Sequence, residues 1–287
     1  MRVYDRKLKT CVEVPEVGAG AIRFVYGTAV GRALAKTILC RKFVSNAYAA
    51  WQKSRFSRGK VRKFMSCYSI SADDCTTQEF PNFNAFFTRQ CQHYVNQTAA
   101  HELPAIADSK LLALPIDEKA VFDVKGVPYT AAELLDDPTL AAEFSGGLCL
   151  IFRLAPDDYH RYVYPDAGEQ ERTVEIPGVL HTVNPIAGSL GVYRRNARRY
   201  TRLHTAHFGD MVQMEVGALL VGKIRNHRET PGAFEKLGEK GYFEYGGSTV
   251  ILLCRAGAVQ IDNDILENSA LGVETAVHIG ERIGEAQ

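Results

Sequence analysis

The chain has 287 residues, of which 46% are hydrophobic and 23% are charged, which suffices for a folded protein with a large core. It contains no uninterrupted apolar run of about 18 residues, so the sequence predicts no membrane-spanning helix. The net charge of +1 conceals an asymmetry, because residues 1–63 contain 15 Lys or Arg and only three acidic residues. The rest of the chain is net acidic. The charge of this acidic part does not exclude any class of binding partner.

The basic leading region has a helical pattern. Between residues 21 and 51, apolar side chains such as Ile22, Val25, Tyr26 and Ala29 recur at steps of three and four. A basic amphipathic helix is typical of an anionic membrane surface, and the same charge could also face a nucleic acid. No nucleic-acid-binding motif accompanies the charge, so we expect no nucleic-acid partner. A helix packed on the protein's own core, with its cations in solvent, is the alternative.

The pattern of apolar and polar residues changes after the basic leading region. The aromatic block at 80–89 is expected to pack internally. Short β-like runs bounded by turn residues follow after residue 110. The predicted strands are 121–124, 148–153, 172–176, 211–216, 242–245, 250–254 and 259–261, with one helix at 131–144. We therefore predict an α+β fold, in which a basic helical region (1–105) that associates with a membrane precedes a mostly antiparallel, β-rich catalytic body (106–287).

Several familiar sites are absent from the sequence. The seven cysteines form no CxxC pair and no regular framework, which favours a reducing compartment and buried thiols. His204 and His207 have a spacing that zinc accepts, but no further ligands accompany them, so we expect no metal. The glycines form neither a dinucleotide fingerprint nor a P-loop, and Ser248 is not in a Gly-x-Ser-x-Gly elbow.

Gly246-Gly247-Ser248-Thr249 precedes the apolar run 250–254 and is the first candidate for chemistry. Because Gly247 has no Cβ, its carbonyl can be approached closely by the following hydroxyl. Attack by Ser248 would convert the peptide bond to an ester, and elimination would leave a ketone at a new chain end. The alternative is an ordinary turn, since these residues are common in turns.

Two titratable residues lie near predicted strand ends. His160, in Asp158-Tyr159-His160-Arg161, can act as a general acid or base, or it can be a structural histidine. Asp117 follows Leu114-Pro115-Ile116, where its carboxylate can orient an imidazole or close an Asx turn.

Taken together, these motifs resemble the phosphatidylserine decarboxylase family. The resemblance covers nearly the whole chain. The matching segments are Val3-Tyr-Asp-Arg6, Asn82-x-Phe-x-x-Phe-Phe-Thr-Arg89, the Pro-x-Asp turn at Asp117, Pro156-x-Asp-Tyr-His-Arg161, Val183-Asn-Pro-Ile-Ala187, Phe208-Gly-Asp210, Glu215-Val-Gly217, Gly238-Glu-Lys-Gly-Tyr-Phe243 and Gly246-Gly-Ser-Thr249. Many motifs in one order are far more specific than any one of them.

The resemblance implies a proenzyme that cleaves itself between Gly247 and Ser248, giving a large chain and a small chain. Ser248 would become a covalent pyruvoyl group, the cofactor, whose ketone accepts electrons as phosphatidylserine loses carbon dioxide to give phosphatidylethanolamine. His160 matches the histidine assigned to decarboxylation, and Asp117 matches the carboxylate of an Asp-His-Ser self-cleavage triad. The implied location is the cytoplasmic side of the cell membrane, as a peripheral protein. The oligomeric state is left open, and a homodimer is one of its alternatives.

The chain departs from the family pattern at two positions. The family motif is Asp-Tyr-His-Arg-x-His, and Val163 occupies the place of its second histidine, the base of the triad. Glu118 replaces a glycine after Asp117. His160, His181 or Glu118 could supply the missing base. Otherwise the chain stays whole as a non-catalytic lipid-binding paralogue; a third alternative is a pyruvoyl-dependent decarboxylase of a soluble amino acid.

Overall fold

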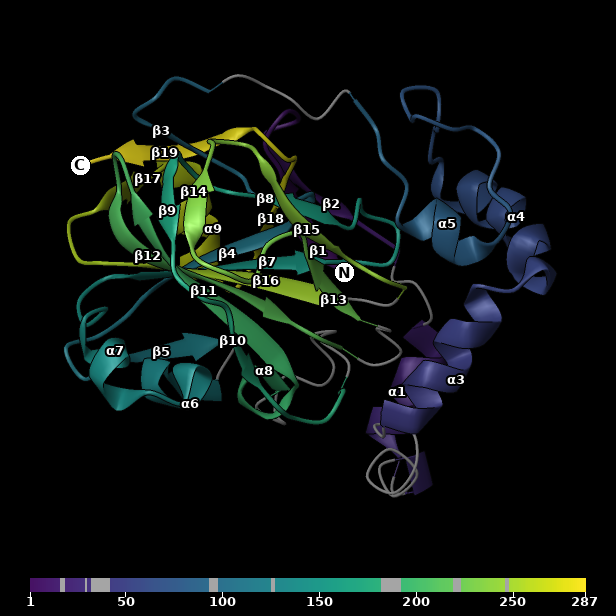
Figure 1. The fold of residues 1–287 in the computed structure, drawn as a ribbon, viewed down its shortest axis with the longest axis horizontal. Helices are drawn as coiled ribbons and strands as arrows, with labels where there is room; N and C mark the ends of the chain where they lie inside the picture. Colours follow the sequence, from purple (N-terminus) through teal and green to yellow (C-terminus); the bar gives the residue numbers. More distant parts are fainter. Residues whose placement is uncertain are drawn as a thin grey trace.

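The computed structural model describes residues 1–15, 19–28, 30–31, 42–92, 98–124, 127–181, 192–218, 223–245 and 248–287. An 11-stranded sheet forms the body of the molecule (Figure 1). The strand order is β14 (Gly232–Phe234), β9 (Gly168–Gln170), β11 (Arg198–Thr205), β12 (Gly209–Val216), β16 (Ser248–Cys254), β7 (Leu148–Leu154), β4 (Ser109–Pro115), β18 (Glu274–Val277), β1 (Arg2–Asp5) and β2 (Thr10–Glu13), with β10 (Val174–Ile176) paired to β11. Among the strand pairs described in this sheet, only β1–β18 is parallel, which confirms the mostly antiparallel body.

Three smaller β-structures complete the body. One sheet contains β13 (Ile224–Asn226), β15 (Glu239–Phe243) and β8 (Arg161–Val163), and another contains β17 (Val259–Ile261), β19 (Arg282–Ala286) and β3 (Glu102–Pro104). The last is the hairpin of β5 (Val121–Val124) and β6 (Val127–Thr130). Helix α9 (Asn263–Ala270) packs on β4, where Ala113 donates its backbone N–H to Ser269 Oγ at 2.9 Å.

The remaining helices fall into two groups. The first is α1 (Ala19–Gly27), α3 (Lys42–Gln52), the 3₁₀ turn η2 (Arg55–Ser57), α4 (Arg58–Tyr68) and α5 (Phe83–Phe87), which lie to one side of the sheet in Figure 1. The second is α6 (Ala131–Leu135), α7 (Pro138–Ala142) and α8 (Val192–Arg195). The α+β prediction is therefore confirmed. The segment 32–41 of the predicted N-terminal helix lies outside the described residues.

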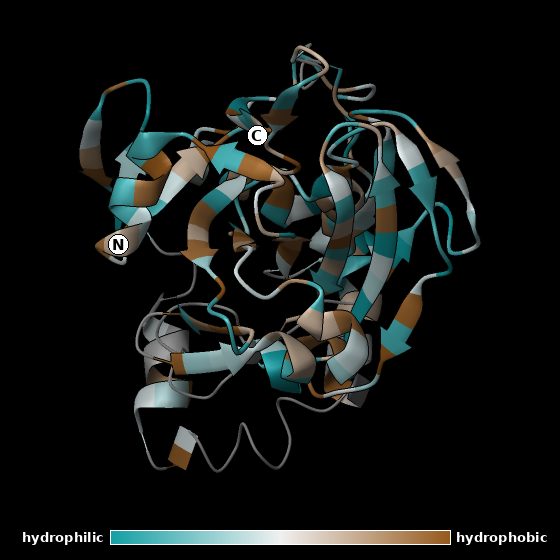
Figure 2. Ribbon diagram, turned by 90° about the vertical axis from the view of Figure 1, so that its left-hand side faces the viewer, coloured by the Kyte–Doolittle hydropathy of each residue, from teal (hydrophilic) through white to brown (hydrophobic). Residues whose placement is uncertain are grey.

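The centre of the large sheet is apolar on both faces. All seven residues of β16 are buried, as are six of the seven in each of its near neighbours β7 and β4. A strand covered on both faces needs a continuous apolar run, which is why the segments 148–153 and 250–254 could be predicted as strands. Figure 2 shows strands whose colour changes between teal, white and brown along their length, so polar and apolar residues alternate within them.

Two predicted elements differ in the structure. The helix predicted at 131–144 is two short helices, because Asp136 is left-handed with φ 53° and Asp137 is extended and caps α7, which starts at Pro138. Proline disfavours the helical conformation in the residue before it. Residues 1–105 are not helical throughout, since β1 and β3 pair with strands of the body and β2 pairs with β1.

The aromatic block at 80–89 packs internally, as predicted. Phe80, Phe83, Phe86 and Phe87 form a buried cluster with Val61 of α4. A disulfide between Cys75 and Cys91 closes the loop that carries this cluster. The irregular cysteine spacing did not predict this bond. Cys149 and Cys254 are buried free thiols on neighbouring strands, as expected, whereas the free thiol of Cys67 is exposed and that of Cys11 is half-buried.

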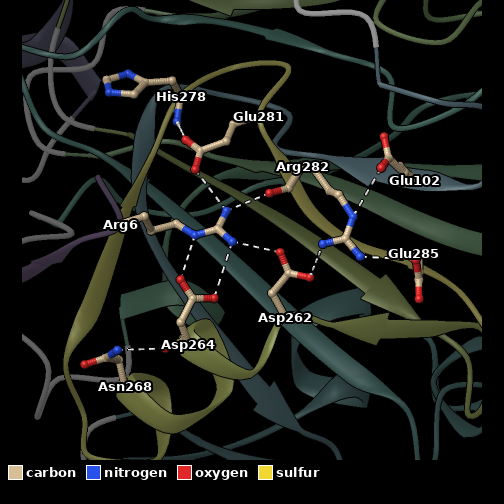
Figure 3. A network of polar contacts seen from close by, with 9 residues as sticks. All are labelled: Arg6, Glu102, Asp262, Asp264, Asn268, His278, Glu281, Arg282 and Glu285. Atoms are coloured by element: carbon tan, nitrogen blue, oxygen red, sulfur yellow. Dashed lines mark hydrogen bonds and ion pairs between the residues drawn. The ribbon is translucent and has the colours of Figure 1, made fainter. Parts of the chain in front are cut away.

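Residues 248–287 are built into two of the sheets. They supply β16 at the centre of the large sheet, β18 between β4 and β1, and two strands of the β17–β19–β3 sheet. Arg6, just after β1, also holds this segment (Figure 3). Its guanidinium donates to Asp264 at 2.8 Å, to Asp262 at 2.7 Å and to Glu281 at 2.9 Å. A break before Ser248 would therefore leave the last 40 residues bound by sheet hydrogen bonds and by this ionic cluster.

Candidate functional site

Ser248 is the first residue of the central strand β16. It pairs with Leu154 at the end of β7 and is completely buried. Its Oγ has no hydrogen-bond partner among the residues that the structure describes. Gly246 and Gly247, the other half of the predicted cleavage site, lie outside those residues. A buried hydroxyl without a partner is costly, and the Ser248 hydroxyl shares this property with those of Thr249 and Thr275.

The Ser248 side chain faces the small sheet that contains β8. Residues two apart on a strand share a face, so Ser248 and Leu252 point the same way, and so does Gln213, which pairs with Leu252. Gln213 Nε2 donates to the Val163 carbonyl of β8 at 3.2 Å. His160 immediately precedes β8. The topology thus brings Ser248 and His160 to the same interface between two sheets.

His160 is held rigidly at this interface. Its ring is completely buried and lies against Phe87, with the ring centroids 3.8 Å apart. Phe87 in turn contacts Tyr245, three residues before Ser248. The Nδ1 atom of His160 lies 2.9 Å from the Asp158 carbonyl. Because a carbonyl can only accept, Nδ1 carries the hydrogen, and Nε2 is the atom that can exchange a proton.

Asp117 lies at the far end of the same strands. Pro115, at the end of β4, pairs with Leu148, and Leu148 pairs with Cys254 at the end of β16 opposite to Ser248. Six residue steps at about 3.3 Å each separate the two ends of β16 by roughly 20 Å. The structure therefore does not bring Asp117 to Ser248, and Glu118 shares its distant turn.

Asp117 instead closes an Asx turn. The side chain is exposed, and its Oδ1 accepts the backbone N–H groups of Lys119 and Val121, each at 2.8 Å. This is the alternative role that turn chemistry allows for the residue. One carboxylate nearer to the Ser248 end is Asp108, which is buried just before β4. Its Oδ1 accepts the Ile279 N–H at 2.8 Å.

Two ion pairs at the Ser248 end, one buried and one partly buried, were missed by sequence reasoning. Lys110 Nζ donates to Asp158 at 2.6 Å, and Arg153 Nε donates to Glu274 at 3.0 Å. Lys110 and Arg153 are directly opposite each other on β4 and β7. Burial raises the pKa of Asp158, and the neighbouring Lys110 charge opposes that rise. The sequence did contain a signal for these ion pairs, because each of two apolar strands includes one cation. A charge buried in such a strand requires a partner of opposite charge.

The Lys110–Asp158 pair also fixes the turn before His160. Besides binding Lys110, Asp158 accepts the Ala155 N–H at 2.7 Å, while its backbone carbonyl meets His160 Nδ1. One residue thus joins β4, the end of β7 and the histidine. The sequence showed that Asp158 belongs to the motif, but it did not show which groups its side chain and backbone bind.

The helices α3 and α4 and the turn between them carry an exposed surface of mixed character. Trp51 and Phe56 are 39% and 74% exposed. Around them lie the exposed cations Lys53, Arg55, Arg58, Lys60, Arg62 and Lys63. Lys60 Nζ lies 3.6 Å from the centre of the Trp51 ring. We call this set of eight residues the basic aromatic surface. Of the helices that the structure describes, none has the length and apolarity to cross a bilayer.

Comparison with known proteins gives one consistent result. Residues 83–285 match the sequence model of the family described as phosphatidylserine decarboxylase. The chain is 40% identical over 287 residues to phosphatidylserine decarboxylase proenzyme 2 of Clostridium acetobutylicum, covering 99% of this chain and 98% of that protein. It is 37% identical over 291 residues to a phosphatidylserine decarboxylase proenzyme of Clostridium botulinum and 35% identical to one of Clostridium perfringens, each covering 99% of both chains.

Proposed function

The chain belongs to the phosphatidylserine decarboxylase family, and we propose that it is a proenzyme that cleaves itself between Gly247 and Ser248 and then decarboxylates phosphatidylserine at a membrane surface. The observation that carries this proposal is the Ser248 hydroxyl at the head of the central strand, which is buried and has no partner among the described residues. It directly follows two glycines, in a family whose proenzymes derive a pyruvoyl group from a serine. The other half of the reacting bond, Gly247, is known here from the sequence alone.

The residues around Ser248 fit a pyruvoyl group formed at its position. The ketone would supply an electron sink for the carboxylate that leaves. His160 is the residue that we propose to handle protons in that reaction, because its Nδ1 is fixed as the donor, which leaves Nε2 as the atom that can exchange a proton. Phe87 and the Asp158 turn hold the ring in place. The burial of both residues keeps water from competing for the reacting atoms.

The basic aromatic surface supports a peripheral location on the cytoplasmic side of the cell membrane. Each Lys or Arg near an anionic leaflet contributes about 1 kcal/mol of binding, and exposed Trp and Phe side chains can enter the interface. Removing two of its cations, Arg58 and Arg62, should lower affinity for phosphatidylserine vesicles roughly 30-fold. Removing Lys119 and Arg172, two exposed cations of the body, is the matched control.

Gel filtration tests whether the protein is a homodimer.

The intact mass of the purified protein tests the proposed function. Wild type is expected as two chains, the smaller of 40 residues beginning at position 248 and reacting with a hydrazine. Ser248→Ala should stay whole, and Thr249→Ala, a neighbouring buried hydroxyl, should still cleave. A wild-type chain that is unbroken and inert to hydrazine, yet binds vesicles, would identify the lipid-binding paralogue. Decarboxylation of free amino acids without vesicles would identify the soluble-substrate enzyme.

A further inference from the structure

Self-cleavage requires a proton acceptor that this chain lacks at the family position. Val163 stands where the second motif histidine is expected. Its backbone N–H donates to the Ile106 carbonyl at 3.0 Å, its carbonyl accepts from Gln213, and its side chain belongs to the main apolar core. Valine cannot take a proton. Glu118 lies in the distant turn beside Asp117, so two histidines are left from the three candidates that the sequence offered.

We infer that His181 is the residue that accepts the proton from Ser248 during self-cleavage. This inference rests on the proposed function. Its first support is the register of the sheet. Val216 of β12 pairs with Thr249 in the last pair of the β12–β16 ladder, so the next residue, Gly217, follows at the end of the ladder where Ser248 lies. Facing residues of such a pair lie about 4.5–5.5 Å apart at their Cα atoms. Whatever is bound to Gly217 is therefore close to the reacting hydroxyl.

Asn196 ties His181 to that position. Its amide is completely buried and uses all three of its hydrogen bonds on two residues. Nδ2 donates to the Gly217 carbonyl at 2.7 Å and to the His181 carbonyl at 2.8 Å, while Oδ1 accepts the His181 N–H at 2.9 Å. A fully satisfied buried amide fixes its partners in one arrangement. The backbone of His181 is thus cross-linked to the residue next to Ser248.

The packing on Gly217 also brings the His181 segment close. A Cβ at Gly217 would lie 3.1 Å from Leu180 Cδ2 and 3.2 Å from the Ala197 carbonyl oxygen. The residue before His181 therefore packs directly against Gly217, with no room for a larger side chain between them. A glycine in a strand often marks such a close approach.

The surroundings of His181 favour its neutral form. The residue is buried, and burial together with the nearby Arg195 charge lowers the pKa of the imidazole. Tyr26 of α1 covers it edge-on, with the ring centroids 6.3 Å apart. A histidine that is neutral at neutral pH is ready to accept a proton, whereas a protonated one is not.

The proposed step conserves atoms and charge. The Ser248 Oγ–H proton passes to a ring nitrogen of His181 as the oxygen bonds to the Gly247 carbonyl carbon. The bond from that carbon to the Ser248 nitrogen then breaks, and the nitrogen takes the proton back from His181. The products are an ester between Gly247 and Ser248 and a free amine on Ser248. Histidine is unchanged at the end, as a catalyst must be.

The experiment is a time course of cleavage of the full chain made by cell-free synthesis, followed by gel and intact mass. His181→Ala and His181→Gln should slow the appearance of the 40-residue chain about 100-fold or more, the usual contribution of a general base. Imidazole added to the His181→Ala protein should restore cleavage. His101→Ala, an exposed histidine before β3, is the matched control and should cleave at the wild-type rate.

The outcomes separate this inference from the proposed function. If wild type cleaves and His181→Ala cleaves within threefold of it, His181 is not the acceptor, but the proenzyme stands. If both His181 variants are slow, melt far below wild type and do not respond to imidazole, the role is structural and the inference fails. If His160→Ala, rather than the His181 variants, blocks cleavage, one histidine serves both steps and the inference also fails. Wild type that never cleaves would remove the proposed function itself.

Discussion

The imidazole of His160 lies against the ring of Phe87, with 3.8 Å between their centroids and 34° between their planes. Phe87 also packs on Tyr245, close to the predicted cleavage site. A residue from the N-terminal helical region therefore sets the position of a residue proposed for catalysis in the β-rich body. The aromatic motif 82–89 contributes to the site through packing and need not touch the substrate.

Replacing Phe87 with leucine should impair decarboxylation without impairing self-cleavage. Leucine keeps most of the volume but loses the ring contact, which is worth about 0.5–1.5 kcal/mol, so kcat should fall up to about tenfold. The measurement is carbon dioxide release from phosphatidylserine vesicles by fully cleaved protein. Phe80→Leu, in the same cluster but not against His160, is the control. Equal losses in both variants would mean that Phe87 acts only through stability.

Asp117→Asn should leave the rate of self-cleavage within about twofold of wild type. The amide oxygen of asparagine can still accept the Lys119 and Val121 N–H groups, so the turn should survive. Only the charge is removed, and it lies roughly 20 Å from Ser248 along β16. A tenfold slower cleavage, measured by gel, would show that this carboxylate reaches the serine in a conformation different from the one described.

Arg6→Ala should weaken the hold on the small chain after cleavage. Arg6 belongs to the large chain, and its three carboxylate partners, Asp262, Asp264 and Glu281, all belong to the small one. Losing the guanidinium leaves three like charges near one another without their shared partner. Gel filtration in increasing urea should release the small chain at a lower urea concentration. Arg194→Ala, which breaks the exposed pair with Glu133, should not change the release point.

His204 should make stability depend on pH. Hydrogen bonds to Asp210 and then Glu171 raise the pKa of the folded imidazole above its usual 6.5. The stabilisation is then complete below pH 6.5 and is lost as the pH rises through the folded pKa. His204 is 45% exposed, so solvent screens the pair and the effect should stay within about 1 kcal/mol. The melting temperature of His204→Gln should fall below wild type at pH 6 and match it at pH 9. A difference that grows with pH would contradict this assignment.

The sequence by itself determined the fold class, the central strands and the family. Residues 250–254 and 148–152 are continuous apolar runs, and a strand covered on both faces needs one, so their position required no knowledge of their neighbours. The order of the motifs around His160 and Ser248 likewise identified the family. Both signals are local in the chain, and physical causes that act over a few residues can be recognised in a sequence.

Tertiary structure alone decided which polar groups meet. Strand register places Asp117 at the end of β16 away from Ser248, and it places Gly217 with its Asn196 and His181 contacts at the near end. Lys110 and Asp158, 48 positions apart, pair only because β4 and β7 are neighbours. Such pairings depend on how strands are ordered in the sheet. The periodicity of side chains along a strand determines which of its faces is buried. It does not determine which strand lies beside it, or which end of that neighbouring strand a loop will reach.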